Sequence, residues 1–90
     1  MSDVSIPSEQ NSALNFTDLQ GQYLAFIHAY RKLHRVAPAE QDMERYFGVT
    51  PPTVHRMVME LEKRGLITRI PRKARSIELQ VPPDQLPALR

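Results

Sequence analysis

Hydrophobic side chains recur every three or four positions in three parts of the chain, which is the period of an α-helix. These runs cover residues 18–34, 40–47 and 51–64. Two later runs differ: residues 66–70 are rich in β-branched side chains, and residues 76–81 alternate apolar with polar side chains, as strands do. The pattern therefore predicts three helices followed by a β-hairpin.

Local signals set the ends of these helices. Thr17 and Gln20 have the spacing of a capping box, which predicts that the first helix begins at residue 18. Thr50 is a typical N-cap residue, and Pro51 suits the first helical position because proline needs no hydrogen-bond acceptor there. Gly65 then follows the last turn, where glycine commonly ends a helix.

The order of elements predicts a fold class. A short second helix joined by about three residues to a well-capped third helix is typical of a helix-turn-helix, and a hairpin after it makes the motif winged. We expect a mainly α winged helix-turn-helix over residues 16–81, with three helices and a two-stranded β-hairpin wing. Residues 1–15 are expected to be a disordered arm, and residues 82–90 an extended proline-rich tail without a core of its own.

The third helix has two different sides. Val54, Met57, Val58 and Leu61 share one arc and are expected to face the core, whereas the opposite arc is polar. In a helix-turn-helix this opposite arc enters the major groove of DNA. The residues expected to read base edges are Pro52, Thr53, His55, Arg56 and Met59.

Each side chain on this arc suits a particular contact. Arg56 can donate two hydrogen bonds to O6 and N7 of guanine, and His55 can donate to a base edge or to a phosphate. Thr53 can contact a thymine methyl group or a phosphate. The residues expected to contact the DNA backbone are Thr50 beside the exposed N–H groups of the helix, Lys63, and the hairpin-tip residues Arg72, Lys73 and Arg75.

Charge supports this interpretation. The 90-residue chain has a formal net charge of only +2, but residues 53–77 contain seven Lys and Arg against two Glu. A local basic surface attracts a polyanion even when the total charge is small. The alternative is that these basic residues form an ordinary solvent-exposed charged face that binds no ligand.

Composition excludes several other classes. There is no Cys, and the three histidines share no ligand spacing, so no metal site and no cofactor are expected. Neither a Ser-His-Asp arrangement nor a glycine-rich phosphate loop occurs, and we expect no enzyme. No run approaches the roughly 18 apolar residues of a membrane span, and residues 1–10 do not form a signal peptide. We therefore expect a cytoplasmic protein without a membrane partner.

Several motifs within residues 16–79 resemble the N-terminal DNA-binding domain of LexA-type repressors. They are Phe16-Thr17-x-x-Gln20, Pro38-Ala39 before Met43, Phe47-Gly48-Val49-Thr50-Pro51, Leu61-Glu62-Lys63-Arg64-Gly65-Leu66-Ile67 and Arg75-Ser76-Ile77-Glu78-Leu79. The resemblance implies that the start of the third helix reads bases. The chain departs from the family's usual residues at positions 52, 53, 55 and 56, so the family's operator is not implied. The family's second domain, with its Ser-Lys self-cleavage dyad, has no counterpart in these residues, and self-cleavage is not implied.

We therefore expect a nucleoid-associated bacterial regulator of transcription, a repressor rather than an activator, that binds double-stranded DNA. One alternative is a winged-helix protein-interaction module without DNA binding, and another is an accessory fragment of an enzyme. Tight binding by so small a domain favours a homodimer on a two-fold site. Its surface would come from residues 1–17, from the proline-rich tail, or from the exposed side of the first helix, formed by Tyr23, Phe26 and Tyr30.

Overall fold

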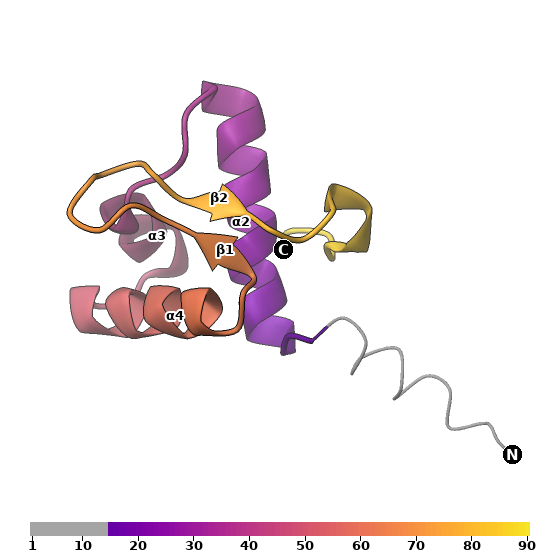
Figure 1. The fold of residues 1–90 in the computed structure, drawn as a ribbon, viewed down its shortest axis with the longest axis horizontal. Helices are drawn as coiled ribbons and strands as arrows, with labels where there is room; N and C mark the ends of the chain where they lie inside the picture. Colours follow the sequence, from indigo (N-terminus) through magenta and orange to yellow (C-terminus); the bar gives the residue numbers. More distant parts are fainter. Residues whose placement is uncertain (1–14) are drawn as a thin grey trace, which may run out of the picture.

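The computed structural model describes residues 15–90. The arm predicted over residues 1–15 lies, except for Asn15, outside the described residues. Helix α2 (Asp18–His34) forms a column, and the hairpin of strands β1 (Ile67–Thr68) and β2 (Glu78–Leu79) crosses it (Figure 1). Helices α3 (Glu40–Phe47) and α4 (Pro51–Lys63) lie beside the lower half of this column. This arrangement is the winged helix-turn-helix that the sequence predicts.

Helix α2 extends over Asp18–His34, as predicted. Both bonds of the capping box are present: the Gln20 N–H donates to Thr17 Oγ1 at 3.1 Å, and the Thr17 N–H donates to Gln20 Oε1 at 3.0 Å. The helix ends at Arg35, whose φ of 64° is left-handed. Two reciprocal bonds at its start and one left-handed residue at its end therefore fix its length.

Helix α3 extends over Glu40–Phe47, again as predicted. Ala39 occupies the N-cap position and has no side-chain oxygen to offer. Asp42 compensates, because its Oδ2 accepts the Ala39 N–H at 2.8 Å. Gly48 ends the helix with a left-handed φ of 66°, and its N–H donates to Glu44 O at 2.9 Å.

Helix α4 extends over Pro51–Lys63. The Leu66 N–H donates to Leu61 O and the Gly65 N–H donates to Glu62 O, each at 3.0 Å, which is the Schellman pattern that glycine in this position favours. The cap at the other end differs from the prediction. Thr50 occupies the N-cap position, but its hydroxyl lies 2.9 Å from that of Thr53 and makes no capping bond to the backbone.

The two strands of the wing are shorter than predicted. Strands β1 (Ile67–Thr68) and β2 (Glu78–Leu79) pair antiparallel, with Ile67 opposite Leu79. The ladder stops because Ser76 takes over its hydrogen bonds: Ser76 Oγ accepts the Ile70 N–H at 2.9 Å and lies 2.8 Å from Lys73 O. Residues 69–77 therefore form an irregular loop, the wing loop, where longer strands were expected.

The core joins all of these elements except the wing loop tip. Tyr23 and Phe26 of α2 belong to it, with 2% and 8% of their surfaces exposed, and the Tyr23 ring stacks on Phe47 at 4.1 Å. The prediction that these two residues form an exposed dimer surface is therefore wrong. The buried apolar residues are Tyr23, Leu24, Phe26, Ile27, Ala37, Met43, Val54, Val58, Leu61, Leu66, Ile67, Ile77 and Val81.

The tail packs on the domain, contrary to the extended segment that was predicted. It contains a 3₁₀ turn, η1 (Pro83–Gln85), and returns to α2. The buried Gln22 side chain donates to Ala88 O and accepts the Arg90 N–H, each at 2.9 Å. The Arg90 guanidinium lies 2.8 Å from Asp18 and, through this hydrogen bond, lowers the pKa of that carboxyl. Gly21 allows the approach, since a Cβ there would lie 3.0 Å from Pro87.

Candidate nucleic-acid interface

The outer side of α4 is the first part of the site. Val54, Val58 and Leu61 are fully buried on the inner side, and this burial fixes the rotation of the helix. Four of the five predicted base readers are consequently exposed, whereas Thr53 is half-buried. The exposed four are Pro52, His55, Arg56 and Met59.

The first turn of α4 offers few backbone donors to an anion. Pro51 and Pro52 have no N–H, and the N–H groups of Thr53 and Val54 both donate to Thr50 O, at 3.0 and 3.2 Å. The expectation that Thr50 binds a phosphate beside exposed N–H groups of the helix is therefore wrong in its mechanism. An anion near this helix end would meet hydroxyl groups and cationic side chains instead.

Arg56 stands apart on this surface. It is exposed, and no carboxylate of residues 15–90 lies within 4 Å of its guanidinium. Lys63 is also exposed but lies seven residues further along, roughly 10 Å along the helix axis. Arg56 is thus placed to reach a ligand near the start of the helix, and Lys63 near its end.

Arg69 joins the wing to α4, a role that the sequence did not indicate. Its Nη2 lies 2.9 Å from Met59 Sδ, and its Nε donates to Glu62 Oε1 at 3.1 Å. Met59 therefore has a polar partner on its sulfur although 43% of its surface is exposed. A basic residue near the end of the predicted strand 66–70 is visible in the sequence, but spacing does not indicate that Arg69 contacts Met59 and Glu62 of α4.

The cationic residues of the wing loop divide into two groups. Arg72 and Lys73 are exposed and have no carboxylate within 4 Å in the described part of the chain. Arg75 is already bonded: its Nη1 lies 3.0 Å from Tyr30 Oη, 3.1 Å from Ala37 O and 3.2 Å from Asp42 Oδ2. The bond to Tyr30 raises the pKa of Arg75 above its usual value, with Asp42 adding to the effect.

Asp42 connects the start of α3 to the wing loop. It caps α3 through the Ala39 N–H and also holds the Arg75 guanidinium of the wing loop. One signal in the sequence indicates the capping role of Asp42, since an acidic residue three positions after the N-cap has capping-box spacing. Its link to the wing had no such signal.

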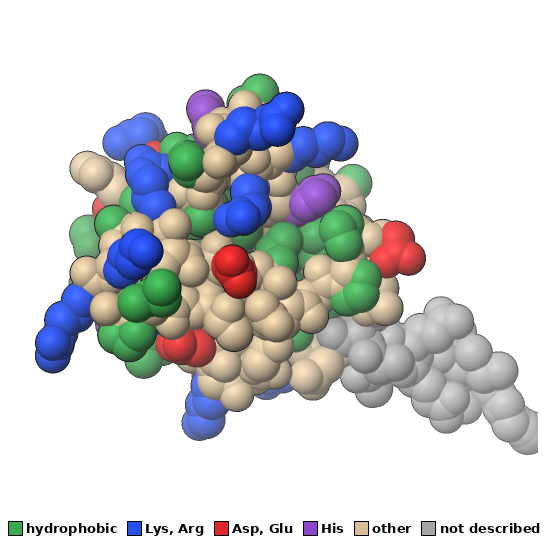
Figure 2. Space-filling view, turned by 45° about the horizontal axis from the view of Figure 1, so that its top comes forward, with side chains coloured by type: hydrophobic (Ala, Val, Ile, Leu, Met, Phe, Trp, Pro, Cys, Tyr) green, Lys and Arg blue, Asp and Glu red, His purple; other side chains and the backbone are tan. Residues whose placement is uncertain are grey.

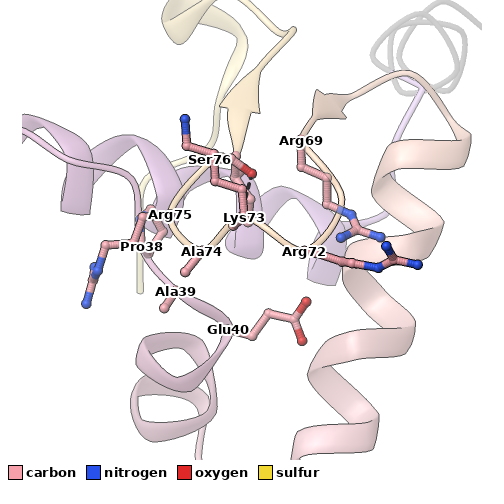
Figure 3. A pocket seen from close by; sticks show the side chains of 10 residues that line it. Pro38, Ala39, Glu40, Arg69, Arg72, Lys73, Ala74, Arg75 and Ser76 are labelled. Atoms are coloured by element: carbon pink, nitrogen blue, oxygen red, sulfur yellow. Dashed lines mark hydrogen bonds between the residues drawn. The ribbon is translucent and has the colours of Figure 1, made fainter.

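A hollow of about 270 Å³ lies between the wing loop and the start of α3. Figure 3 shows the guanidinium groups of Arg69 and Arg72 on the α4 side of this hollow, with the Glu40 carboxylate facing the same space. The Glu40 carboxylate oxygens each lie 3.4 Å from Nδ1 of His55 on α4. The wing loop and the start of α3 therefore line the hollow, and Glu40 connects it to His55 on α4.

Lys and Arg side chains outnumber Asp and Glu on the face shown in Figure 2. Within residues 15–90 no group of three or more His, Asp or Glu could hold a metal ion. No helix in that same range is long and apolar enough to span a bilayer.

The fold and this surface define a winged helix-turn-helix domain with exposed cationic side chains on α4 and the wing loop. The sequence model of the LexA DNA-binding domain family matches residues 13–76. The chain belongs to this family, which confirms the resemblance that its motifs predict.

Relatives include the LexA repressor of Thermosipho africanus, 38% identical over 68 residues, which are 76% of this chain and 34% of that protein. The LexA repressor of Thermosipho melanesiensis is 40% identical over 63 residues, 70% of this chain and 32% of that protein. The LexA repressor of Bartonella quintana is 34% identical over 68 residues, 74% of this chain and 29% of that protein. The chain therefore spans about a third of the length of these relatives.

Proposed function

We propose that this protein is a transcriptional repressor that binds double-stranded DNA, with α4 in the major groove. The observation that carries the proposal is a set of exposed cations that have no carboxylate within 4 Å among residues 15–90: Arg56 on α4, together with Arg72 and Lys73 on the wing loop. Family membership supports it, because the matching family is a DNA-binding domain and the relatives are named repressors. Binding to chromosomal DNA would place the protein in the cytoplasm, at the nucleoid. We propose no catalytic role.

The proposed contacts follow from exposure and bonding. Residues of the outer side of α4 read base edges, and Arg56 supplies the bidentate contact to guanine. Thr50, Lys63, Arg72 and Lys73 contact phosphates, which position the domain without reading sequence. Arg75, whose guanidinium is bonded to α2, α3 and the segment between them, acts instead by holding the wing loop in place.

Loss of the two wing cations should weaken binding to every duplex. The variant Arg72→Asn, Lys73→Gln suits this test, because Arg72 has a left-handed φ of 65° that asparagine tolerates. If each residue contacts one phosphate, the slope of log K against log salt should become shallower by about 1.8, at roughly 0.9 for each lost contact. Fluorescence anisotropy with a random duplex at several salt concentrations measures that slope.

A matched control removes the same charge elsewhere. Lys32→Ala, Arg64→Ala changes two exposed cations that do not belong to the wing loop, one in the last turn of α2 and one at the C-cap of α4. Its salt slope should stay within experimental error of the unmodified protein. An equal change of slope in both variants would show that only net charge matters, and an unchanged slope in the wing variant would remove the wing contact from the proposal.

We further propose that two copies bind a two-fold related site, because one domain of this size covers few base pairs. Tyr23 and Phe26 are buried, so the interface would have to use other residues. Sedimentation velocity of the protein, alone and with a duplex that contains a two-fold site, tests the proposal. A monomer under both conditions refutes it.

A further inference from the structure

Glu40 and His55 lie on different helices and meet at the edge of the proposed DNA-binding surface. Glu40 is the first residue of α3, and His55 lies in the second turn of α4. We infer that Glu40 is a positioning residue that fixes the proton of the neutral His55 ring on Nδ1, so that Nε2 reads a hydrogen-bond donor on a base edge. This inference rests on the proposed function and names the chemistry of one of its contacts.

The first step concerns the proton. Nδ1 of His55 is 3.4 Å from both carboxylate oxygens of Glu40. An ionised carboxylate only accepts hydrogen bonds, so the nitrogen that faces it must carry the hydrogen. A neutral imidazole has a single N–H, and Nε2 is then left with a free lone pair.

The second step concerns the placement of the carboxylate. Glu40 lies in the first turn of α3, where the helix dipole favours negative charge. Its side chain is 33% exposed, and it lines the hollow beneath the wing loop, where Figure 3 shows it facing the side that carries Arg72. The packing of α3 against α4 therefore holds an acceptor next to one edge of the His55 ring.

The third step concerns the free nitrogen. The His55 side chain is 58% exposed, and its Nδ1 edge is turned toward α3. Nε2 lies on the other edge of the ring and is therefore available to a ligand of α4. As an acceptor it pairs with the amino group of cytosine or adenine and meets unfavourably the acceptors of guanine and O4 of thymine.

This chemistry differs from that of the neighbouring residue. The Arg56 guanidinium has donors only and selects acceptor edges, above all those of guanine. His55 in its neutral form would select the opposite kind of edge. This inference differs from the expectation from the sequence, in which His55 donates to a base edge or to a phosphate.

A second proton on the ring should reverse the preference of His55. The protonated ring donates from both nitrogens, so Nε2 would then favour guanine, O4 of thymine or a phosphate.

The tautomer can be measured on the free protein. Two-bond ¹H–¹⁵N spectra of the full chain at pH 8 distinguish a protonated ring nitrogen from an unprotonated one. We expect the Nδ1–H form to predominate in the unmodified protein and Glu40→Gln to give a mixture, because an amide can either accept from or donate to Nδ1. A predominant Nε2–H form in the unmodified protein would overturn the inference without involving DNA.

Base preference is measured by selection from a random duplex library, and His55→Ala identifies the position that residue 55 reads. At pH 8 the unmodified protein should prefer cytosine or adenine there by about five-fold, as expected for one hydrogen bond. Glu40→Gln should reduce this preference to less than about two-fold. The control Glu44→Gln, which removes the same charge from α3, should leave it unchanged.

The outcomes separate the two levels of the proposal. Duplex binding with a preference at this position that Glu40→Gln leaves intact would overturn the inference while DNA binding stands. A preference for guanine or thymine at pH 8 would do the same. Failure of every form of the protein to bind any duplex at low salt would overturn the proposed function, and the base preference inferred for His55 with it.

Discussion

Replacement of Tyr23 by alanine should lower the free energy of unfolding by about 3–5 kcal/mol, the usual cost of removing a large buried aromatic ring. Only 2% of the Tyr23 surface is exposed, and its ring stacks on Phe47 with an interplanar angle of 10°. A domain of this size has a total stability of only about 5–10 kcal/mol. Denaturant unfolding followed by circular dichroism should therefore show a large fall in the midpoint.

Leu33→Ala is the matched control on the same helix. Leu33 is 77% exposed, and its replacement should change the free energy of unfolding by no more than about 0.5 kcal/mol. If Tyr23→Ala instead unfolded at the original midpoint and altered sedimentation, Tyr23 would be a surface residue of an assembly. That result would contradict the packing of α2 described here.

Arg56→Ala should weaken binding to the selected duplex by about 1–3 kcal/mol, or roughly five- to 150-fold, and relax the choice of base at one position. The guanidinium is exposed on the outer side of α4, and no carboxylate of residues 15–90 competes for it. Arg56→Lys should recover the charge but not the choice of base, because an ammonium group cannot form the two parallel bonds. Competition binding with duplexes that vary at that position measures both effects.

Arg64→Ala provides the comparison for Arg56. Arg64 follows the last turn of α4 and is bonded to Glu60 at 2.9 Å, so its loss should leave the base preference intact. A base preference that survives Arg56→Ala unchanged would remove Arg56 from the reading surface.

The helices could be predicted from the sequence because their ends depend on residues close together in the chain. Thr17 and Gln20 are three residues apart, and Gly65 directly follows the residue that closes α4. Such contacts form within one or two turns, whatever the rest of the chain does.

The wing and the tail could not be predicted in the same way. The Ser76 hydroxyl shortens the strands by bonding Ile70, six residues away, and nothing in a strand pattern indicates this. The tail is held by Gln22, whose partners Ala88 and Arg90 lie 66 and 68 residues further along. Prolines indicate an extended segment, but they do not indicate the surface on which it packs.

The sequence indicated which side of α4 is exposed, but not how its side chains are bonded to other elements. The core side follows from spacing alone, since Val54, Val58 and Leu61 share one face. By contrast, the Glu40–His55 contact and the bonds of Arg75 depend on how α3 and the wing loop pack. The exposed side of α4 is the basis for predicting DNA binding. The contacts made by α3 and the wing loop are the basis for proposing which residues contact DNA and which hold other residues in position.

Backbone amide mapping tests the proposed surface most directly. The ¹⁵N-labelled protein is titrated with a duplex at low salt, and shift changes are followed for each residue. The largest changes should fall in residues 50–59 and in the wing loop, with small changes around Leu19 and Leu33. Changes that gather on those two exposed residues of α2 instead, or no change anywhere at saturating duplex, would contradict a DNA-binding surface formed by α4 and the wing.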